Sequence, residues 1–272
     1  MRPLLLLLMP LCLSMSPTGP IASRPATAAL PVIEIDPLTQ LPTADQFAEL
    51  ARTDPVRMLE FCIARYQREI QGYRAVMEKH ELINGKQLPR EIVNVAFREH
   101  PFSVYMKWTE GADRAEASVF VAGENNDQLI IRPKSRAARW IVSYVTRDPE
   151  SPDVREVSRF SVRDFGIQKG TIRTLVAWKA AKDLGMFRFE YLGIESVKEA
   201  GGRLCYMIRR DVNPPEEDGL TQVTIAIDVE TWLQVGSWLK AGDTPIAEYH
   251  FRNIEPNPTF GPKQFKTEGL KE

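Results

Sequence analysis

The sequence predicts an α+β fold in which two or three helices cover a large curved antiparallel sheet. Two stretches, 54–70 and 171–184, place apolar residues at three- and four-residue steps, the spacing of a helix with one buried face. About ten other stretches alternate apolar and polar residues with the period of two of a half-buried strand. Turn-forming residues separate these stretches at short intervals, so consecutive strands are expected to pair as antiparallel neighbours.

The first 28 residues have the features of a secretory signal peptide. Arg2 precedes a leucine-rich run over 4–13, and Ala26-Thr27-Ala28 matches the A-x-A pattern that signal peptidase cuts. The apolar run is shorter than a membrane span, and an uncleaved N-terminal anchor is the alternative. The residues before Cys12 are not the small ones of a lipid-attachment site, so there is no lipobox. We therefore expect a protein exported to the periplasm or the cell envelope.

Charge and composition restrict the class of partner. The whole chain has 35 Lys and Arg residues against 36 Asp and Glu residues, and 43% of its residues are apolar. Cleavage after Ala28 would remove Arg2 and Arg24, leaving 33 basic against 36 acidic residues and a net charge near −3. A chain so close to neutrality gives no reason to expect nucleic acid as a partner. The ~240 remaining residues could form one large domain or two small ones, with a substantial core.

The first ordered elements are expected to be helical. Residues 29–53 read as a lead-in, extended at first and then helical for one or two turns. Residues 54–70 form a helix with Asp54 as N-cap and Pro55 at the first position, where the missing N–H does no harm. The inner face of this helix carries Val56, Leu59, Ile63, Tyr66 and Ile70.

Strands follow in a meander. Residues 73–82 lead to Asn84-Gly85, a pair that accepts the positive φ angles of a tight hairpin turn, and 91–99 return. Two further strands, 117–123 and 128–133, flank a polar turn. Between them and the hairpin lies the stretch HPFSVYMKW, which alternates after its proline, so that one face carries Phe102, Val104, Met106 and Trp108.

The middle of the chain differs from both sides. Residues 132–166 are charged and interrupted by prolines, and they read as a long excursion with one short strand. A second helix over 171–184 and five more strands complete the fold. The excursion contains a basic cluster, formed by Arg132, Lys134, Arg136 and Arg139. We interpret this cluster as a solvated loop with Trp140 packed beneath it, and binding of an anionic head group or an acidic partner is the alternative.

No motif in the sequence names a reaction. The histidines, His80, His100 and His250, are isolated and lack the spacing of metal ligands. Nucleophile elbows and phosphate-binding glycine loops are absent from the sequence. The acids at 216–218 lie among prolines and a glycine and read as a solvated loop. We therefore predict no catalytic residues, no metal and no cofactor.

Two cysteines, Cys62 and Cys205, remain after the signal peptide. In an oxidising compartment they could form a disulfide. The alternative is two buried free thiols, each packed as a small apolar side chain.

The strand faces carry the strongest sign of a ligand. They are rich in aromatic residues and Met, which usually means core, but a strongly curved sheet can enclose a pocket instead. We predict that the lining of such a cavity includes Phe102, Val104, Met106, Trp108, Val119, Val121, Phe187, Phe189 and Tyr206.

The order of elements resembles that of the LolA/LolB-like superfamily of periplasmic lipoprotein carriers. An amphipathic helix is followed by strands and a helix-bearing excursion, and the chain closes with YHFRNIEPNPTFGPKQFK, where Phe251, Asn253 and Phe265 carry the match. More narrowly, residues 54–265 resemble the bacterial domain of unknown function 1571, chiefly through GYRAVMEKHELINGK, HPFSVYMKW and VAGENNDQLI. The resemblance implies a half-open β-barrel, LolA-like, with the helices on its concave face. It also implies a single domain over 54–267, a tail over 268–272, and an apolar interior that receives acyl chains.

Three functions follow in order of preference. The first is an exported non-enzymatic protein that binds a lipid, an acylated protein or another hydrophobic ligand in the half-barrel. The second is a protein-interaction or sensor module of the cell envelope with a filled barrel. The third is a hydrolase whose site is assembled from distant residues, which predicts convergent acids or histidines with perturbed pKa values. The sequence defines no oligomeric state.

Overall fold

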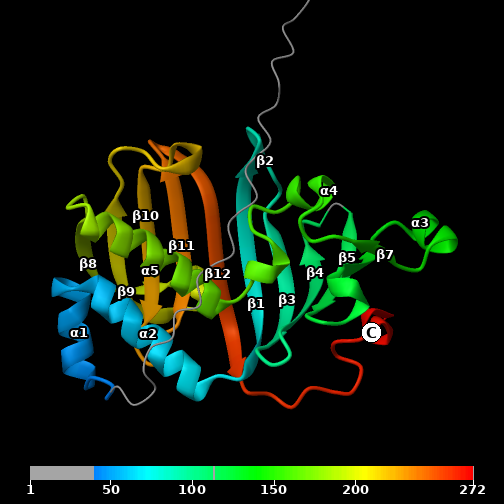
Figure 1. The fold of residues 1–272 in the computed structure, drawn as a ribbon, viewed down its shortest axis with the longest axis horizontal. Helices are drawn as coiled ribbons and strands as arrows, with labels where there is room; N and C mark the ends of the chain where they lie inside the picture. The colour runs from blue at the N-terminus through cyan, green and yellow to red at the C-terminus, as the bar shows by residue number, and fades with distance from the viewer. Residues whose placement is uncertain (1–39, 113, 272) are drawn as a thin grey trace, which may run out of the picture.

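A computed structural model describes residues 40–112 and 114–271 (Figure 1). The predicted signal peptide and the first part of the lead-in lie outside these residues. Twelve strands form one antiparallel sheet, in the spatial order β7-β6-β5-β4-β3-β1-β12-β11-β10-β9-β8, and β2 pairs only with β1. Because β7 and β8 lie at opposite edges, the sheet is open, as predicted.

The sheet consists of two meanders that meet where β1 pairs with β12. The strands of the first meander are β1 (Gly72–Ile83), β2 (Lys86–Gln87), β3 (Glu91–Arg98), β4 (Ser103–Glu110), β5 (Ala115–Val121), β6 (Leu129–Pro133) and β7 (Val145–Arg147). The strands of the second are β8 (Arg188–Val197), β9 (Arg203–Asp211), β10 (Gln222–Asp228), β11 (Gln234–Ala241) and β12 (Thr244–Pro256). The predicted hairpin turn is confirmed, since Asn84 and Gly85 have positive φ angles between β1 and β2.

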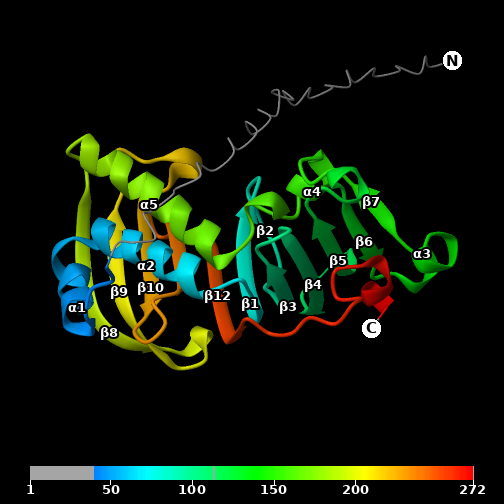
Figure 2. The same ribbon diagram turned by 60° about the horizontal axis from the view of Figure 1, so that its bottom comes forward.

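Three of the five α-helices cover one face of the second meander (Figures 1 and 2). The α-helices are α1 (Ala44–Thr53), α2 (Pro55–Glu69), α3 (Arg136–Ile141), α4 (Pro152–Arg155) and α5 (Ile167–Asp183). Short 3₁₀ turns are η1 (Asn125–Asp127), η2 (Val162–Asp164), η3 (Lys198–Ala200), η4 (Glu217–Gly219) and η5 (Thr267–Lys271). The covering helices are α1, α2 and α5, and none of the helices in the described ranges has the length and apolar character needed to cross a membrane.

The start of α2 agrees with the sequence prediction. The carboxylate of Asp54 accepts a hydrogen bond from the Arg57 N–H (3.2 Å), and Pro55 occupies the first helical position. The helical part of the lead-in is longer than the one or two turns expected. A capping box between Thr43 and Gln46 starts α1, which extends for ten residues and buries Phe47 against the ring of Trp232, 3.8 Å away and nearly parallel.

The helices pack on the second meander in a core that we call the helix-side core. Leu59 and Ile63 of α2 and Leu175 of α5 are fully buried there, together with Ile208, Ile225 and Ile227 of the sheet. Trp178 completes the inner stripe of α5. Burial of these large side chains stabilises the fold by about 1.5–3 kcal/mol for each of them.

The end of the chain runs from β12 back to the first meander (Figure 2) and covers the face of β4 and β5 that carries Tyr105 and Val119. Phe265 and Leu270 are buried there against Tyr105, Val119 and Val121. The guanidinium of Arg98 lies 4.7 Å from the ring centre of Phe265. The residues after 267, predicted to be a tail, therefore contribute to the core.

The excursion between the two meanders contains α3, β7 and α4. Residues 148–166, which we call the covering segment, lie on the same side of the sheet as the helices. Arg163 donates a hydrogen bond to the carbonyl of Asp127 (3.0 Å), and Ile167 donates to the hydroxyl of Tyr73 (3.2 Å). The segment is thus fixed both to the turn between β5 and β6 and to β1. One interpretation from the sequence is wrong: Trp140 does not pack beneath the basic cluster, because its side chain is 91% exposed.

Candidate ligand cavity

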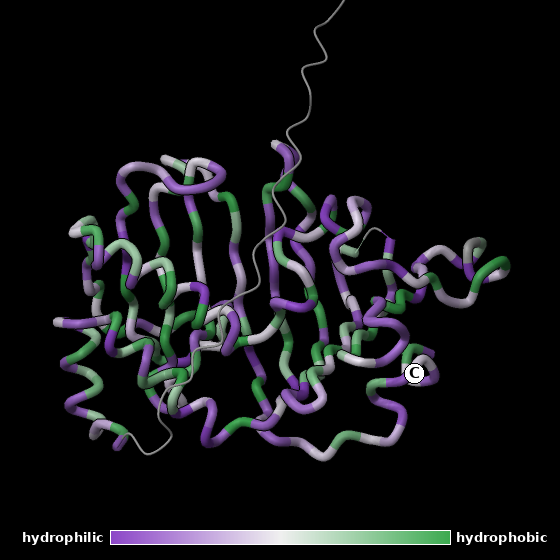
Figure 3. The backbone as a smooth tube through the Cα atoms, in the orientation of Figure 1, coloured by the Kyte–Doolittle hydropathy of each residue, from purple (hydrophilic) through white to green (hydrophobic). Residues whose placement is uncertain are grey.

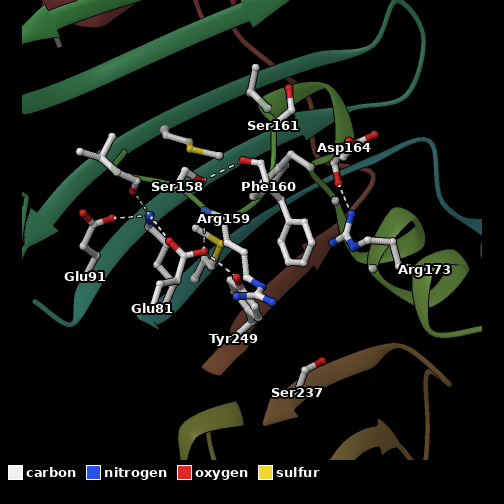
Figure 4. Close-up of a pocket in the computed structure, with 18 of the residues that line it drawn as sticks. Glu81, Glu91, Ser158, Arg159, Phe160, Ser161, Asp164, Arg173, Ser237 and Tyr249 are labelled. Carbon is white, nitrogen blue, oxygen red and sulfur yellow. Dashed lines mark hydrogen bonds and ion pairs between the residues drawn. The ribbon is translucent and has the colours of Figure 1, made fainter. Parts of the chain in front are cut away.

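A cavity of about 570 Å³ lies between the sheet, α5 and the covering segment (Figure 4). Strands of both meanders contribute to its wall, and the covering segment lies over part of it on the other side. The apolar wall from the sheet includes Met77, Met106, Trp108, Leu129, Ile131 and Phe251. The covering segment adds Val154, Val157, Phe160, Val162 and Phe165.

Strand register places Met106 and Trp108 on this wall. Met106 pairs with Val95 and Trp108 with Val93, and side chains that alternate along β4 point to opposite faces of the sheet. The indole N–H of Trp108 donates to the Glu91 carboxylate (2.8 Å), which holds the ring in place. Both side chains are partly buried.

The other residues predicted to line the cavity lie elsewhere. Phe102 and Val104 belong to the core around Phe97, whose ring is 5.4 Å from that of Phe102. Val119 pairs with Tyr105 and shares its face, where the chain terminus covers it, and Val121 lies on the same side. Phe187, Phe189 and Tyr206 pack in the helix-side core. On β5 it is Ser118 that faces the cavity.

An ionic network, missed by the sequence analysis, lies inside the cavity. The ammonium of Lys79 is 3.1 Å from the carboxylates of both Glu81 and Glu91, and it donates to the carbonyl of Val157 (3.2 Å). Burial would lower the pKa of Lys79, but the two carboxylates raise it overall. Lys79 therefore remains charged and attaches the covering segment to β1.

Glu81 is the centre of the network. Its carboxylate accepts hydrogen bonds from the Tyr249 hydroxyl (2.5 Å) and from the Arg159 backbone N–H (3.2 Å). Burial would raise the pKa of Glu81, but Lys79 and these donors lower it overall. Burial and the nearby Glu81 charge raise the pKa of Tyr249. These groups thus keep their charge states around neutral pH and are poorly suited to proton transfer.

Five arginines belong to the wall, and Arg159, Arg173 and Arg210 lie among them. Arg159 forms an ion pair with Asp218 (2.6 Å) and Arg210 one with Glu216 (2.6 Å). Arg173 makes no ion pair with any described residue: it donates to the carbonyl of Asp164 (2.7 Å) and lies 4.1 Å from the ring centre of Phe160. Burial lowers the pKa of Arg173, and the nearby Tyr249 and Asp164 compensate for the lost hydration only in part. A guanidinium without an ion pair is a natural partner for an anionic or strongly polar group.

The remaining candidate residues lie outside the cavity. Within the ranges that the structure describes, no group of His, Cys, Asp and Glu side chains could hold a metal ion. His250 is buried on the other face of the sheet, 4.7 Å from Trp238. Cys62 and Cys205 are buried free thiols, so the disulfide that the sequence allowed is not formed in this structure.

Several solved structures are distantly similar to this chain in three dimensions. The lipoprotein LppX of Mycobacterium tuberculosis is 11% identical, with a TM-score of 0.42, over 76% of this chain and 99% of its own. A LolA superfamily protein from Nitrosomonas europaea is 7% identical, with a TM-score of 0.33, over 84% and 99%. A DUF1329 family protein from Desulfovibrio piger is 13% identical, with a TM-score of 0.36, over 80% and 100%. Scores of this size carry no conclusion about function.

Sequence comparison is decisive for the family. None of the curated proteins matches the chain significantly. One family model, that of the proteins of unknown function DUF1571, matches residues 70–269, which is most of the chain. The match includes the three stretches on which the resemblance was predicted, and the protein therefore belongs to the DUF1571 family.

Proposed function

We propose that this protein is an exported, non-enzymatic binding protein whose ligand is a lipid, an acylated protein or another hydrophobic molecule. The observation that carries the proposal is the cavity of about 570 Å³ beneath the covering segment. Ligand pockets typically have volumes of about 300–1,000 Å³. The Met77 and Met106 side chains on its wall are flexible and adapt to a ligand of irregular shape.

The polar groups favour a ligand with a head group as well as an apolar part. Carboxylate or phosphate oxygens would accept hydrogen bonds from Arg173, which has five N–H donors and only one hydrogen-bonded carbonyl among the described residues. The apolar part would lie along Met106, Trp108 and Leu129. Burial of its surface supplies about 25 cal/mol per Å² before the cost of association.

Two further observations support this proposal. The pKa of Lys79 is raised and that of Glu81 is lowered, so both stay charged around neutral pH, which suits binding better than acid–base catalysis. The sequence features of a signal peptide over residues 1–28 support export to the periplasm or the cell envelope.

The test is native mass spectrometry, with solvent extraction and lipid analysis, of protein purified from its own compartment. Ser118 of β5 pairs with Met106 of β4, and both side chains line the cavity. The variant Ser118→Leu places a larger side chain in the cavity beside Met106 and is expected to release the bound ligand. The matched variant Ser118→Ala removes the hydroxyl without filling the cavity and should keep the ligand. An empty cavity in every preparation would sink the proposal. An empty cavity together with crosslinking to an envelope protein would favour the interaction module.

A further inference from the structure

The loop between β6 and β7 carries the most exposed apolar side chains of the described residues. We call residues 134–144, which include α3, the α3 tip. Trp140 is 91% exposed, Ile141 87% and Val142 46%. The tip projects beyond the edge of the sheet, and the tube in Figure 3 has hydrophobic colour at its end. We propose that the α3 tip docks on an anionic lipid membrane, with these three side chains entering the interface.

Charge around the tip complements such a surface. Residues 129–147 contain five basic residues and no acid. The carboxylates of Glu116 and Asp153 pair with three of the five, which leaves a surplus of three positive charges. Arg136 is exposed and makes no ion pair within the described part of the chain. Basic side chains next to exposed apolar ones attract anionic lipid, and Trp favours the boundary between head groups and acyl chains.

The base of the tip is rigidly attached to the sheet. Arg139 pairs with Glu116 of β5 and donates to the carbonyls of Pro133 (2.9 Å) and Lys134 (3.0 Å). Lys134 donates to the carbonyl of Ala112 (2.6 Å). Because these contacts hold the base, the apolar end is presented at a fixed place and pays little additional ordering entropy when it docks.

The small size of the apolar surface favours a membrane over a protein partner. A stable protein interface buries about 800 Å² on each partner, far more than three adjacent side chains offer. The other exposed large apolar side chains of the described residues are less exposed than Trp140 and Ile141, with Leu184 the highest at 69%. The tip is also next to the cavity, since Ile131 of β6 and Val145 of β7 line its wall. A membrane docked on the tip would therefore lie near the β6–β7 side of the cavity.

The test measures binding of the full chain to vesicles of phosphatidylcholine, with and without phosphatidylglycerol in equal parts, by co-sedimentation. Trp140→Ser/Ile141→Ser should weaken binding to the mixed vesicles about tenfold or more. Arg136→Glu should weaken it about tenfold as well, and added salt should lower the affinity of the parent. The matched controls are Leu184→Ser and Arg188→Glu, exposed residues at the other end of the sheet, which should bind as the parent does. The apolar N-terminal sequence could itself bind vesicles, but all variants share it, so only differences in binding between variants and parent are interpreted.

A second measurement reports on the tip alone. Brominated lipids in the vesicles should quench part of the tryptophan fluorescence of the parent, and this part should disappear in Trp140→Phe. The proposal would be overturned if Trp140→Ser/Ile141→Ser bound vesicles as well as the parent, or if quenching were unchanged in Trp140→Phe. It would also be overturned if the tip crosslinked to a protein while the parent did not bind vesicles. Cavity occupancy is measured separately by native mass spectrometry, so an empty cavity would leave the vesicle result standing.

Discussion

The two halves of the sheet consist of the same kind of strand and differ in what covers them. Over β8–β12 three helices cover most of the face, where Leu59, Ile63 and Leu175 have no exposed surface. Only part of this half, such as Ser237 and Leu239 of β11, borders the cavity. Over the first meander lies the covering segment, whose only α-helix, α4, has four residues. Beneath it Met106 and Trp108 are partly buried and border the cavity.

The difference teaches that the cover decides whether an apolar strand face becomes core. An amphipathic helix directs a side chain to the sheet every three or four residues and can fill the space continuously. The covering segment packs only a few apolar side chains, such as Val162 and Phe165, on the sheet core. It is also fixed by polar contacts, such as those of Lys79 with the Val157 carbonyl and of Glu81 with the Arg159 N–H. These few apolar side chains do not fill the space over the apolar wall, and a cavity remains.

The largest effect is expected where the polar attachment is broken. Lys79→Met would leave Glu81 and Glu91 without their ammonium partner in a buried site. Removing one member of a buried ion pair typically costs about 3–5 kcal/mol of unfolding free energy. The measurement is urea denaturation of the variant and the parent at neutral pH.

The control is the same substitution in the helix-covered half. Lys179 is exposed and pairs with Glu60 (2.9 Å), which keeps Arg57 as a second partner. Lys179→Met should cost less than about 1 kcal/mol. Equal losses for the two methionine variants would contradict a special role for the network around Lys79.

Truncation of apolar side chains compares the two halves directly. Leu175→Ala leaves a void in the closely packed helix-side core and should cost about 2–5 kcal/mol. Met106→Ala only enlarges an existing cavity and should cost less than about 2 kcal/mol, while it lowers ligand occupancy. Denaturation of both variants provides the comparison. A loss for Met106→Ala as large as that for Leu175→Ala would mean that this half is packed as tightly as the other.

Much of the fold followed from local patterns. The N-cap of α2, the Asn84-Gly85 turn and the alternation of β4 depend on neighbouring residues, and each was predictable from the sequence. The run Ser118 to Val121 was different, because all four side chains are buried, on two faces. Its apolar character fits either face, so only the pairing of Tyr105 with Val119 shows that Val119 and Val121 point away from the cavity.

The ionic network could be predicted only in part. Met77, Lys79 and Glu81 lie at every second position of β1 and therefore on the same face. Two charged residues on a face that is otherwise apolar could have indicated a buried ion pair. Their partners were not readable, because Arg159 and Tyr249 are 78 and 168 residues away from Glu81 along the chain. The Tyr249 contact depends on the pairing of β1 with β12 and the Arg159 contact on the path of the covering segment, and no local pattern describes either.

Acid should weaken the covering of the cavity before it affects the helix-side core. The pKa of Glu81 is lower in the folded state than its ordinary 4.5, so its stabilisation is present above that pH and is lost as pH falls through the folded value. The pKa of Lys79 is raised, so its contribution is lost only in strong alkali, above 10.5. Below about pH 4.5, hydrogen exchange of the covering segment should accelerate more than that of α2. Equal acceleration in both would show that the two halves open together.

The smallest effect concerns the cysteines, which both belong to closely packed regions. Cys62 lies on α2 in the helix-side core and Cys205 on β9. Burial raises the pKa of both thiols, that of Cys205 to about 12, so almost no thiolate is present at neutral pH. Neither should react with a maleimide reagent in the folded protein, and both should react in urea. A reducing agent should leave the unfolding midpoint unchanged. Rapid labelling of native Cys62 would show that the helices open as readily as the covering segment, and the contrast between the two halves would then have to be abandoned.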